Sequence, residues 1–206
     1  SLKLDNEVSS DIISTGVPGL NDMFQGGGFY RGSNILVSGT AGTAKTTIAC
    51  YFANQQCENK ERTIYFAFEE SPHQLVRNMK SIGINLEKHI KDGLLQIHSS
   101  RPSLNGLELH LLTLRKLIKE FNPTTIVIDP ISNLISVGSE HEVRSMLVRL
   151  IDMLKAHNIT ALFTSLNKQT DNFRPDLAEE SVSSLVDTWI TVRDMEGIGE
   201  RNRGIF

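Results

Sequence analysis

Ten consecutive residues between a short apolar run and a helical stretch constrain this chain more than any other part of its sequence. They read Ser-Gly-Thr-Ala-Gly-Thr-Ala-Lys-Thr-Thr and occupy Ser38 to Thr47, directly after the apolar run Ile35 to Val37. The stretch that follows, up to Asn54, is expected to be helical. Phosphate groups bind where backbone N–H groups converge at the start of a helix beside an ammonium group. The segment therefore predicts a strand, a phosphate-binding loop (P-loop) and a helix, in that order.

The residues of this loop have expected roles toward a bound nucleotide and its Mg²⁺. Lys45 would reach the β- and γ-phosphate oxygens, and the hydroxyl of Thr46 would ligate Mg²⁺. Ala44 stands where the motif normally has glycine, and a methyl group is harmless there only if φ is negative. The alternative interpretation is a glycine-rich turn with an incidental lysine. The residues expected to contact the nucleotide are Gly39, Thr40, Gly42, Thr43, Ala44, Lys45, Thr46 and Thr47.

Short apolar runs recur along the chain with helical stretches between them. Runs without polar alternation are typical of strands that are buried on both faces. Strand and helix in alternation predict an α/β fold, a mostly parallel central sheet flanked by helices. The runs expected to form strands are Ile35 to Val37, Ile64 to Phe68, Leu94 to Ile97, Ile126 to Ile128, Ala161 to Phe163 and Trp189 to Val192.

Helix signals and a late hairpin complete the expected layout. Apolar residues at helical spacing predict helices near Leu107 to Phe121 and His141 to His157. Ser71 before Pro72 predicts the start of another helix, which should stop near Gly83. At the C-terminal end we expect a β-hairpin. Its strands would be Trp189 to Arg193 and Glu200 to Phe206, with a turn over Asp194 to Gly199.

Length and composition limit the class of protein. The 206 residues fit one domain, and the first residue is not Met, so we expect a fragment of a longer protein. No apolar run approaches the ~20 residues of a membrane-spanning helix. A formal net charge of -3 gives no basic footprint of a dedicated nucleic-acid binder. Cys50 and Cys57 would lie too far apart on one helix to form a disulfide, which makes the cytoplasm the expected location.

Three carboxylates follow two of the predicted strands. Asp129 closes the run Thr125 to Ile128, where a Walker B aspartate would hold a water of the Mg²⁺ shell. An aspartate that only caps the turn before Pro130 is the alternative. Glu69 and Glu70 end the strand that precedes them, and one of them could accept a proton from an attacking water or hydroxyl. Solvated charges ahead of a helix N-terminus are the alternative for this pair.

Four segments together resemble the ATPase domain of the KaiC family of circadian clock proteins. They are Gly39 to Thr46, Phe66 to Ser71, Ile126 to Asp129 and Glu179 to Asp187. The resemblance implies a RecA-like P-loop NTPase fold for residues 1–206 as a single domain, one of a tandem pair and more similar to the second. It also implies self-assembly into hexameric rings that hold ATP and Mg²⁺ between subunits, together with clock-type or signalling partner proteins.

The same resemblance assigns roles to individual residues. It implies that Glu69 is the proton acceptor and lies near the metal, with Glu70 beside it. It places Ser81 near the nucleotide. Ser183 and Ser184 fall where the second KaiC domain phosphorylates itself, so serine/threonine autokinase activity could accompany ATP hydrolysis. Plain helix surface is the alternative for these two serines.

Two other classes share parts of this pattern. A recombinase or helicase relative would bind DNA through mobile loops, but Asn167 to Arg174 carries too few basic residues for a track of phosphate contacts. Nucleic acid is therefore an unlikely partner on this interpretation. The second of these classes is a non-catalytic module that binds ATP only to hold an assembly together.

Overall fold

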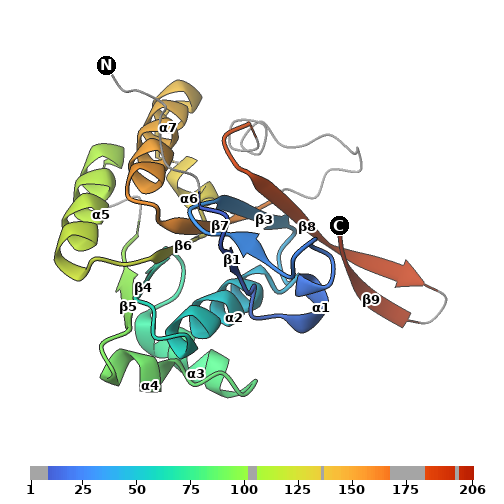
Figure 1. Ribbon diagram of the computed structural model, residues 1–206. Coiled ribbons are helices and arrows are strands. Elements are labelled where there is room, and N and C mark those ends of the chain that lie inside the picture. The colour runs from blue at the N-terminus through green and yellow to red at the C-terminus, as the bar shows by residue number, and fades with distance from the viewer. Residues whose placement is uncertain (1–8, 102–105, 136, 168–183, 198–199) are drawn as a thin grey trace.

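A seven-stranded sheet forms the centre of the domain, as the computed structural model shows for residues 9–101, 106–135, 137–167, 184–197 and 200–206 (Figure 1). The strand order is β5-β4-β6-β7-β3-β8-β9, and all neighbours are parallel except the antiparallel pair β8 and β9. This confirms the predicted mostly parallel α/β fold. The strands are β3 (Asn34–Gly39), β4 (Thr63–Ala67), β5 (Leu95–Ser99), β6 (Thr125–Asp129), β7 (Thr160–Leu166), β8 (Thr188–Gly197) and β9 (Glu200–Ile205).

Helices cover both faces of this sheet (Figure 1). On one face lie α2 (Lys45–Glu58), α3 (Pro72–Lys80) and α4 (Leu86–Lys91), and on the other α5 (Leu107–Phe121), α6 (Ser132–Ile135) and α7 (Glu140–Ala156). Strand residues divide between two apolar clusters, so that Ile35 and Val37 pack with α2 while Leu36 packs with α7. This double burial explains why the strands have no polar alternation.

The capping residues of α3 confirm the helix start that was read from the sequence. The Ser71 side chain accepts a hydrogen bond from the backbone N–H of Gln74, whose own side chain accepts from the backbone of Ser71. After the helix, Gly83 adopts a φ of 89°, a conformation that favours glycine.

In the part of the chain described, no helix combines the length and apolarity needed to cross a membrane.

A two-stranded antiparallel sheet near the N-terminus was not predicted. It pairs β1 (Ile12–Ile13) with β2 (Phe29–Tyr30), and the short helix α1 (Pro18–Asn21) lies between them in the chain. Gly28 makes this pairing possible, because a Cβ there would lie 2.1 Å from the carbonyl oxygen of Ile13. Strands of two residues carry too little periodicity to be recognised in a sequence.

The C-terminal hairpin is confirmed, but the predicted position of its turn was wrong. Strand β8 continues to Gly197, so Asp194 to Gly197 is paired strand and not turn. The reason is a favourable cross-strand partner: Asp194 lies opposite Arg203, with Oδ1 and Nε 3.5 Å apart. Figure 1 shows the hairpin extending from the body of the domain.

Candidate functional site

The sheet order brings the predicted site residues to one edge. The P-loop follows β3, Glu69 and Glu70 follow β4, and Asp129 ends β6. These strands are parallel, so their carboxyl ends lie at the same edge of the sheet. Ligands of open α/β sheets bind outside this edge. Strand β7 lies between β3 and β6 and separates the P-loop from Asp129.

The side chain of Lys45 lies across the P-loop. Its Nζ donates a hydrogen bond to the carbonyl oxygen of Thr40 at 2.6 Å, and the hydroxyl of Thr43 donates to the same oxygen at 2.9 Å. Burial lowers the pKa of Lys45, and the charges of Asp129 and Glu69 oppose this effect. Lys45 is therefore a buried ammonium that both carboxylates influence.

The remaining loop residues line the first turn of α2. Gly39 must be glycine, because a Cβ would lie 2.4 Å from the carbonyl oxygen of Val192 and 2.8 Å from the Thr43 hydroxyl. Gly42 has a φ of 80°, which also favours glycine. Thr46 and Thr47 are half-buried at the start of α2. Backbone N–H groups at a helix start are free to bind an anion.

The backbone of Ala44 has a positive φ, whereas an alanine at this position is free of strain only at negative φ. Its φ is 73° and its ψ 24°, in the left-handed region, although a methyl group there is tolerated without strain only at negative φ. The loop keeps the backbone path that glycine would adopt and carries the methyl group regardless. The condition under which an alanine would be harmless at this position is therefore not met.

We expect Ala44→Gly to stabilise the fold by about 1 kcal/mol, because glycine adopts the left-handed conformation without steric cost. For a chain of this size that corresponds to a rise in Tm of about 2–4 °C, measured by thermal unfolding. ATP affinity should stay the same or rise slightly. Ala41→Gly is the matched control, since Ala41 lies in the same loop outside the positive-φ residues. A Tm for Ala44→Gly equal to or below that of Ala41→Gly would contradict the prediction.

Two hydroxyl groups hold the carboxylate of Asp129. Tyr65 on β4 donates to Oδ2 at 2.6 Å, and Thr164 on β7 donates to Oδ1. Asp129 is 8% exposed, so both bonds are shielded from water. These partners lie on neighbouring strands, which is not the arrangement of a turn-capping aspartate before Pro130. Sequence reasoning missed both hydroxyls, because strand periodicity shows burial but not which strands become neighbours.

The two glutamates diverge toward different partners. Glu69 Oε1 accepts a hydrogen bond from Nδ2 of Asn133 at 3.3 Å, and Glu70 Oε2 accepts from Nδ2 of Asn78 at 3.2 Å. Asn133 belongs to α6 and Asn78 to α3, on opposite faces of the sheet. Glu69 is exposed and Glu70 is half-buried. Glu69 is thus the more accessible of the two carboxylates for proton transfer.

The predicted serines lie in other places. Ser81 is the C-cap of α3, where its hydroxyl donates to the carbonyl oxygen of Asn78 at 2.7 Å. Ser81 is about 15 Å along the helix from Ser71, which follows the glutamates. Ser184 is exposed in a turn before β8, and Ser183 lies outside the described residues. The structure does not bring Ser81 or Ser184 into hydrogen-bond contact with the P-loop.

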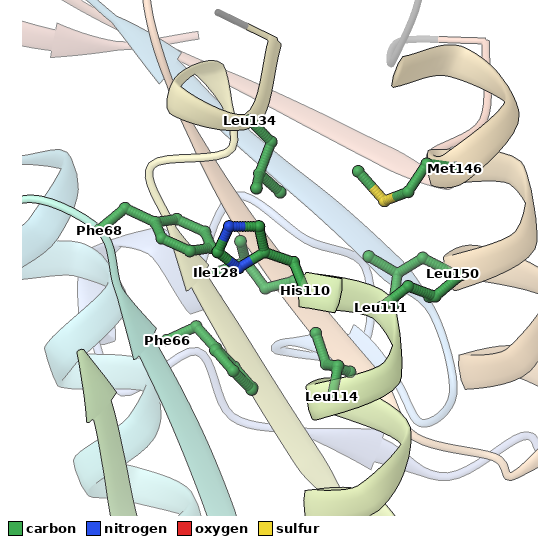
Figure 2. A pocket seen from close by; sticks show the side chains of 9 residues that line it. All are labelled: Phe66, Phe68, His110, Leu111, Leu114, Ile128, Leu134, Met146 and Leu150. Carbon is green, nitrogen blue, oxygen red and sulfur yellow. The ribbon is translucent and has the colours of Figure 1, made fainter. Parts of the chain in front are cut away.

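A small apolar cavity lies on the face of the sheet opposite α2 (Figure 2). Its volume is about 10 Å³, which is room for about one water molecule. The rings of Phe68 and His110 close one side of it, with centroids 5.6 Å apart. The lining residues are Phe66, Phe68, His110, Leu111, Leu114, Ile128, Leu134, Met146 and Leu150. The cavity is a gap in the packing of this apolar cluster and is too small for a nucleotide.

The donor set at the sheet edge fits Mg²⁺. Hydroxyl and carboxylate oxygens come from Thr46, Asp129 and Glu69, and magnesium prefers oxygen ligands. Among the described residues, no group of three or more His, Cys, Asp or Glu side chains is arranged to hold a metal by itself. Proteins usually bind magnesium through one or two carboxylates together with substrate phosphates. The site therefore fits a metal that arrives with a nucleotide.

The sheet order, the loop before α2 and the carboxylates at the same edge define a RecA-like P-loop NTPase domain. A sequence model of the KaiC ATPase family matches residues 13–206. The chain belongs to the KaiC family. Over its full length it is 44% identical to the circadian clock protein KaiC2 of a Synechocystis species, covering 36% of that protein. It is 36% identical to the circadian clock oscillator protein KaiC of Synechococcus elongatus, covering 39%. The chain thus spans less than half the length of these relatives.

Proposed function

We propose that this domain binds ATP with Mg²⁺ and hydrolyses it. The observation that carries the proposal is the meeting of Lys45, Asp129 and Glu69 at one edge of the sheet, where the first two are buried and Glu69 is accessible. The KaiC family membership supports the ATPase class. The finer features, magnesium dependence and the individual site residues, rest on this geometry.

Each group has a part in the reaction. The N–H groups at the start of α2 and the ammonium of Lys45 bind the phosphate oxygens. Thr46 and Asp129 would hold Mg²⁺, which supplies neutralisation of the phosphate charge when bound. Glu69 accepts the proton of the attacking water, and Asn133 orients this carboxylate from α6. Glu70, held by Asn78, adds negative charge beside Glu69.

Self-phosphorylation is a second candidate reaction. It is motivated by the resemblance at Ser183 and Ser184 and by the exposure of Ser184. A hydroxyl held in line with the γ-phosphate can take the place of water, because phosphoryl transfer depends mainly on positioning and electrostatics. The hydroxyl would come from a neighbouring subunit, so this reaction requires an assembly.

The domain would act in the cytoplasm as a subunit of a homo-oligomeric ring. The resemblance to the KaiC family implies six subunits in this ring. The relatives are circadian clock proteins, and clock-type or signalling proteins are the partners we propose. Two buried free cysteines fit a reducing compartment. In the same proposal, the chain is one domain of a tandem pair and is more similar to the second domain of that pair. The loop that a DNA-binding relative would use, Asn167 to Arg174, lies almost wholly outside the described residues.

Assembly should be visible in solution. With ATP and Mg²⁺, we expect light scattering to show a species several times the mass of the 22.9 kDa chain. Arginines of the hairpin, such as Arg193 and Arg203, could then stabilise γ-phosphate charge in a neighbouring subunit, an effect that reaches ~10³-fold where fully developed. A monomer that hydrolyses ATP at the full rate would contradict this prediction.

One assay separates the candidate functions. Single-turnover incubation with γ-labelled ATP and Mg²⁺ gives free labelled phosphate if the domain is an ATPase. Label on the protein, located by mass spectrometry at Ser183 or Ser184, would show self-phosphorylation. ATP that stays bound and intact would show a non-catalytic assembly module and overturn the proposed hydrolysis.

A further inference from the structure

The carboxylate of Asp129 is held from both sides along the sheet. Tyr65 belongs to β4 and Thr164 to β7, and these are the two strands that pair with β6. Each carboxylate oxygen accepts one hydroxyl group. A carboxylate with a donor on each oxygen cannot rotate without breaking a hydrogen bond. The two strands therefore fix the orientation of Asp129.

The hydroxyl of Tyr65 needs an explanation of its own. Tyr65 is 0% exposed and lies in the apolar cluster between the sheet and α2. Phenylalanine would fill nearly the same volume without the cost of burying a hydroxyl group. The hydroxyl has one proton, and it donates that proton to Asp129.

The side chain of Tyr65 also packs in the cluster formed with the helix that begins at the P-loop. Cys50 belongs to the same buried apolar cluster. Cys50 is buried on α2, the helix that starts with Lys45 and Thr46. Tyr65 thus lies in the cluster that packs the helix of the P-loop against the sheet, and its hydroxyl reaches the strand of Asp129.

We propose that Tyr65 and Thr164 form a positioning pair that orients the Asp129 carboxylate toward the metal of the bound nucleotide, and so sets the affinity of the site for the metal–ATP complex. The inference rests on the proposed function and extends it to residues that touch neither ATP nor metal. Partners of this kind typically change metal affinity by about 10- to 100-fold when they are removed. ATP binding without metal depends on the P-loop and should not change.

The test uses Mn²⁺ as the metal probe. Electron paramagnetic resonance measures free Mn²⁺ as it is titrated into the chain with ATP, and calorimetry measures ATP affinity in EDTA. For Tyr65→Phe we expect the Mn²⁺ concentration at half-saturation to rise about 10-fold, with ATP affinity in EDTA unchanged. Tyr30→Phe is the control, because Tyr30 is an exposed tyrosine on β2. Unchanged Mn²⁺ affinity in a folded Tyr65→Phe would overturn the proposal.

Thr164 provides a second, independent pair of variants. Thr164→Ser keeps the hydroxyl and should bind Mn²⁺ like the wild type, whereas Thr164→Val removes it and should bind about 10-fold more weakly. If Tyr65→Phe does not fold, this pair decides, and equal affinities for the two Thr164 variants would overturn the proposal. A wild-type chain that binds no ATP contradicts the proposed function itself. A wild-type chain that binds ATP and Mn²⁺, with unaffected variants, contradicts only the positioning pair.

Discussion

Lys45→Ala should lower ATP affinity by at least about 100-fold. Hydrogen bonds to charged groups contribute roughly 1.5–3 kcal/mol each, and the ammonium can bond to two phosphate oxygens, while about 1.4 kcal/mol corresponds to a tenfold change. The ammonium of Lys45 donates one hydrogen bond to the carbonyl oxygen of Thr40, a contact inside the loop. Calorimetry with ATP and Mg²⁺ measures the loss directly.

The fold should tolerate this change. Burial lowers the pKa of Lys45, so the fold disfavours its charged form, and alanine removes that cost. The Tm of Lys45→Ala should therefore be close to that of the wild type, which separates lost binding from lost structure. Lys119→Ala is the control, because Lys119 is an exposed lysine in the last turn of α5. ATP affinity that is the same in both variants would show that the loop does not bind phosphate.

Glu69→Gln should reduce ATP hydrolysis by about 100-fold or more, the lower end of what a general base contributes. Glutamine keeps the size of the side chain and can still contact Asn133, but it cannot take up a proton at neutral pH. ATP affinity should stay close to the wild-type value. If the protein also phosphorylates itself, labelling of Ser183 and Ser184 should fall in parallel, because both acceptors need the same base.

Two comparisons make the Glu69 result specific. Glu70→Gln should have the smaller effect, since Glu70 is half-buried and bonded to Asn78 on the other face of the sheet. Glu120→Gln changes an exposed glutamate at the end of α5 and should leave the rate unchanged. Phosphate release measured for the three variants would exclude Glu69 as the base if its variant were as active as Glu120→Gln.

The sequence predicted the elements whose residues carry a local signal. Unalternated apolar runs became the strands of the sheet, and Ser71 began α3 with the expected cap. Helices α5 and α7 lie within one residue of their predicted bounds, because each has a continuous apolar stripe that packs on the sheet. Signals of this kind depend on neighbours three or four residues away, which the sequence itself displays.

What the sequence could not show depends on partners far along the chain. Tyr65 meets Asp129 across 64 positions, and only the pairing of β4 with β6 brings them together. The left-handed backbone of Ala44 is imposed by the path of the loop, which overrides the preference of alanine. The turn was predicted over Asp194 to Gly199 because this segment contains glycine, but Asp194 pairs with Arg203 across the strands.

The position of β7 between β3 and β6 fixes the distance between the P-loop and Asp129. Adjacent strands lie about 4.8 Å apart. Strands β3 and β6 are two such spacings apart, so the strand before the P-loop and the strand of Asp129 are held about 10 Å from each other. The interior of β7, from Ala161 to Ser165, is buried on both faces and resists compression. A nucleotide that contacts both the P-loop and Asp129 must therefore reach across this width, as we expect a triphosphate with its cation to do.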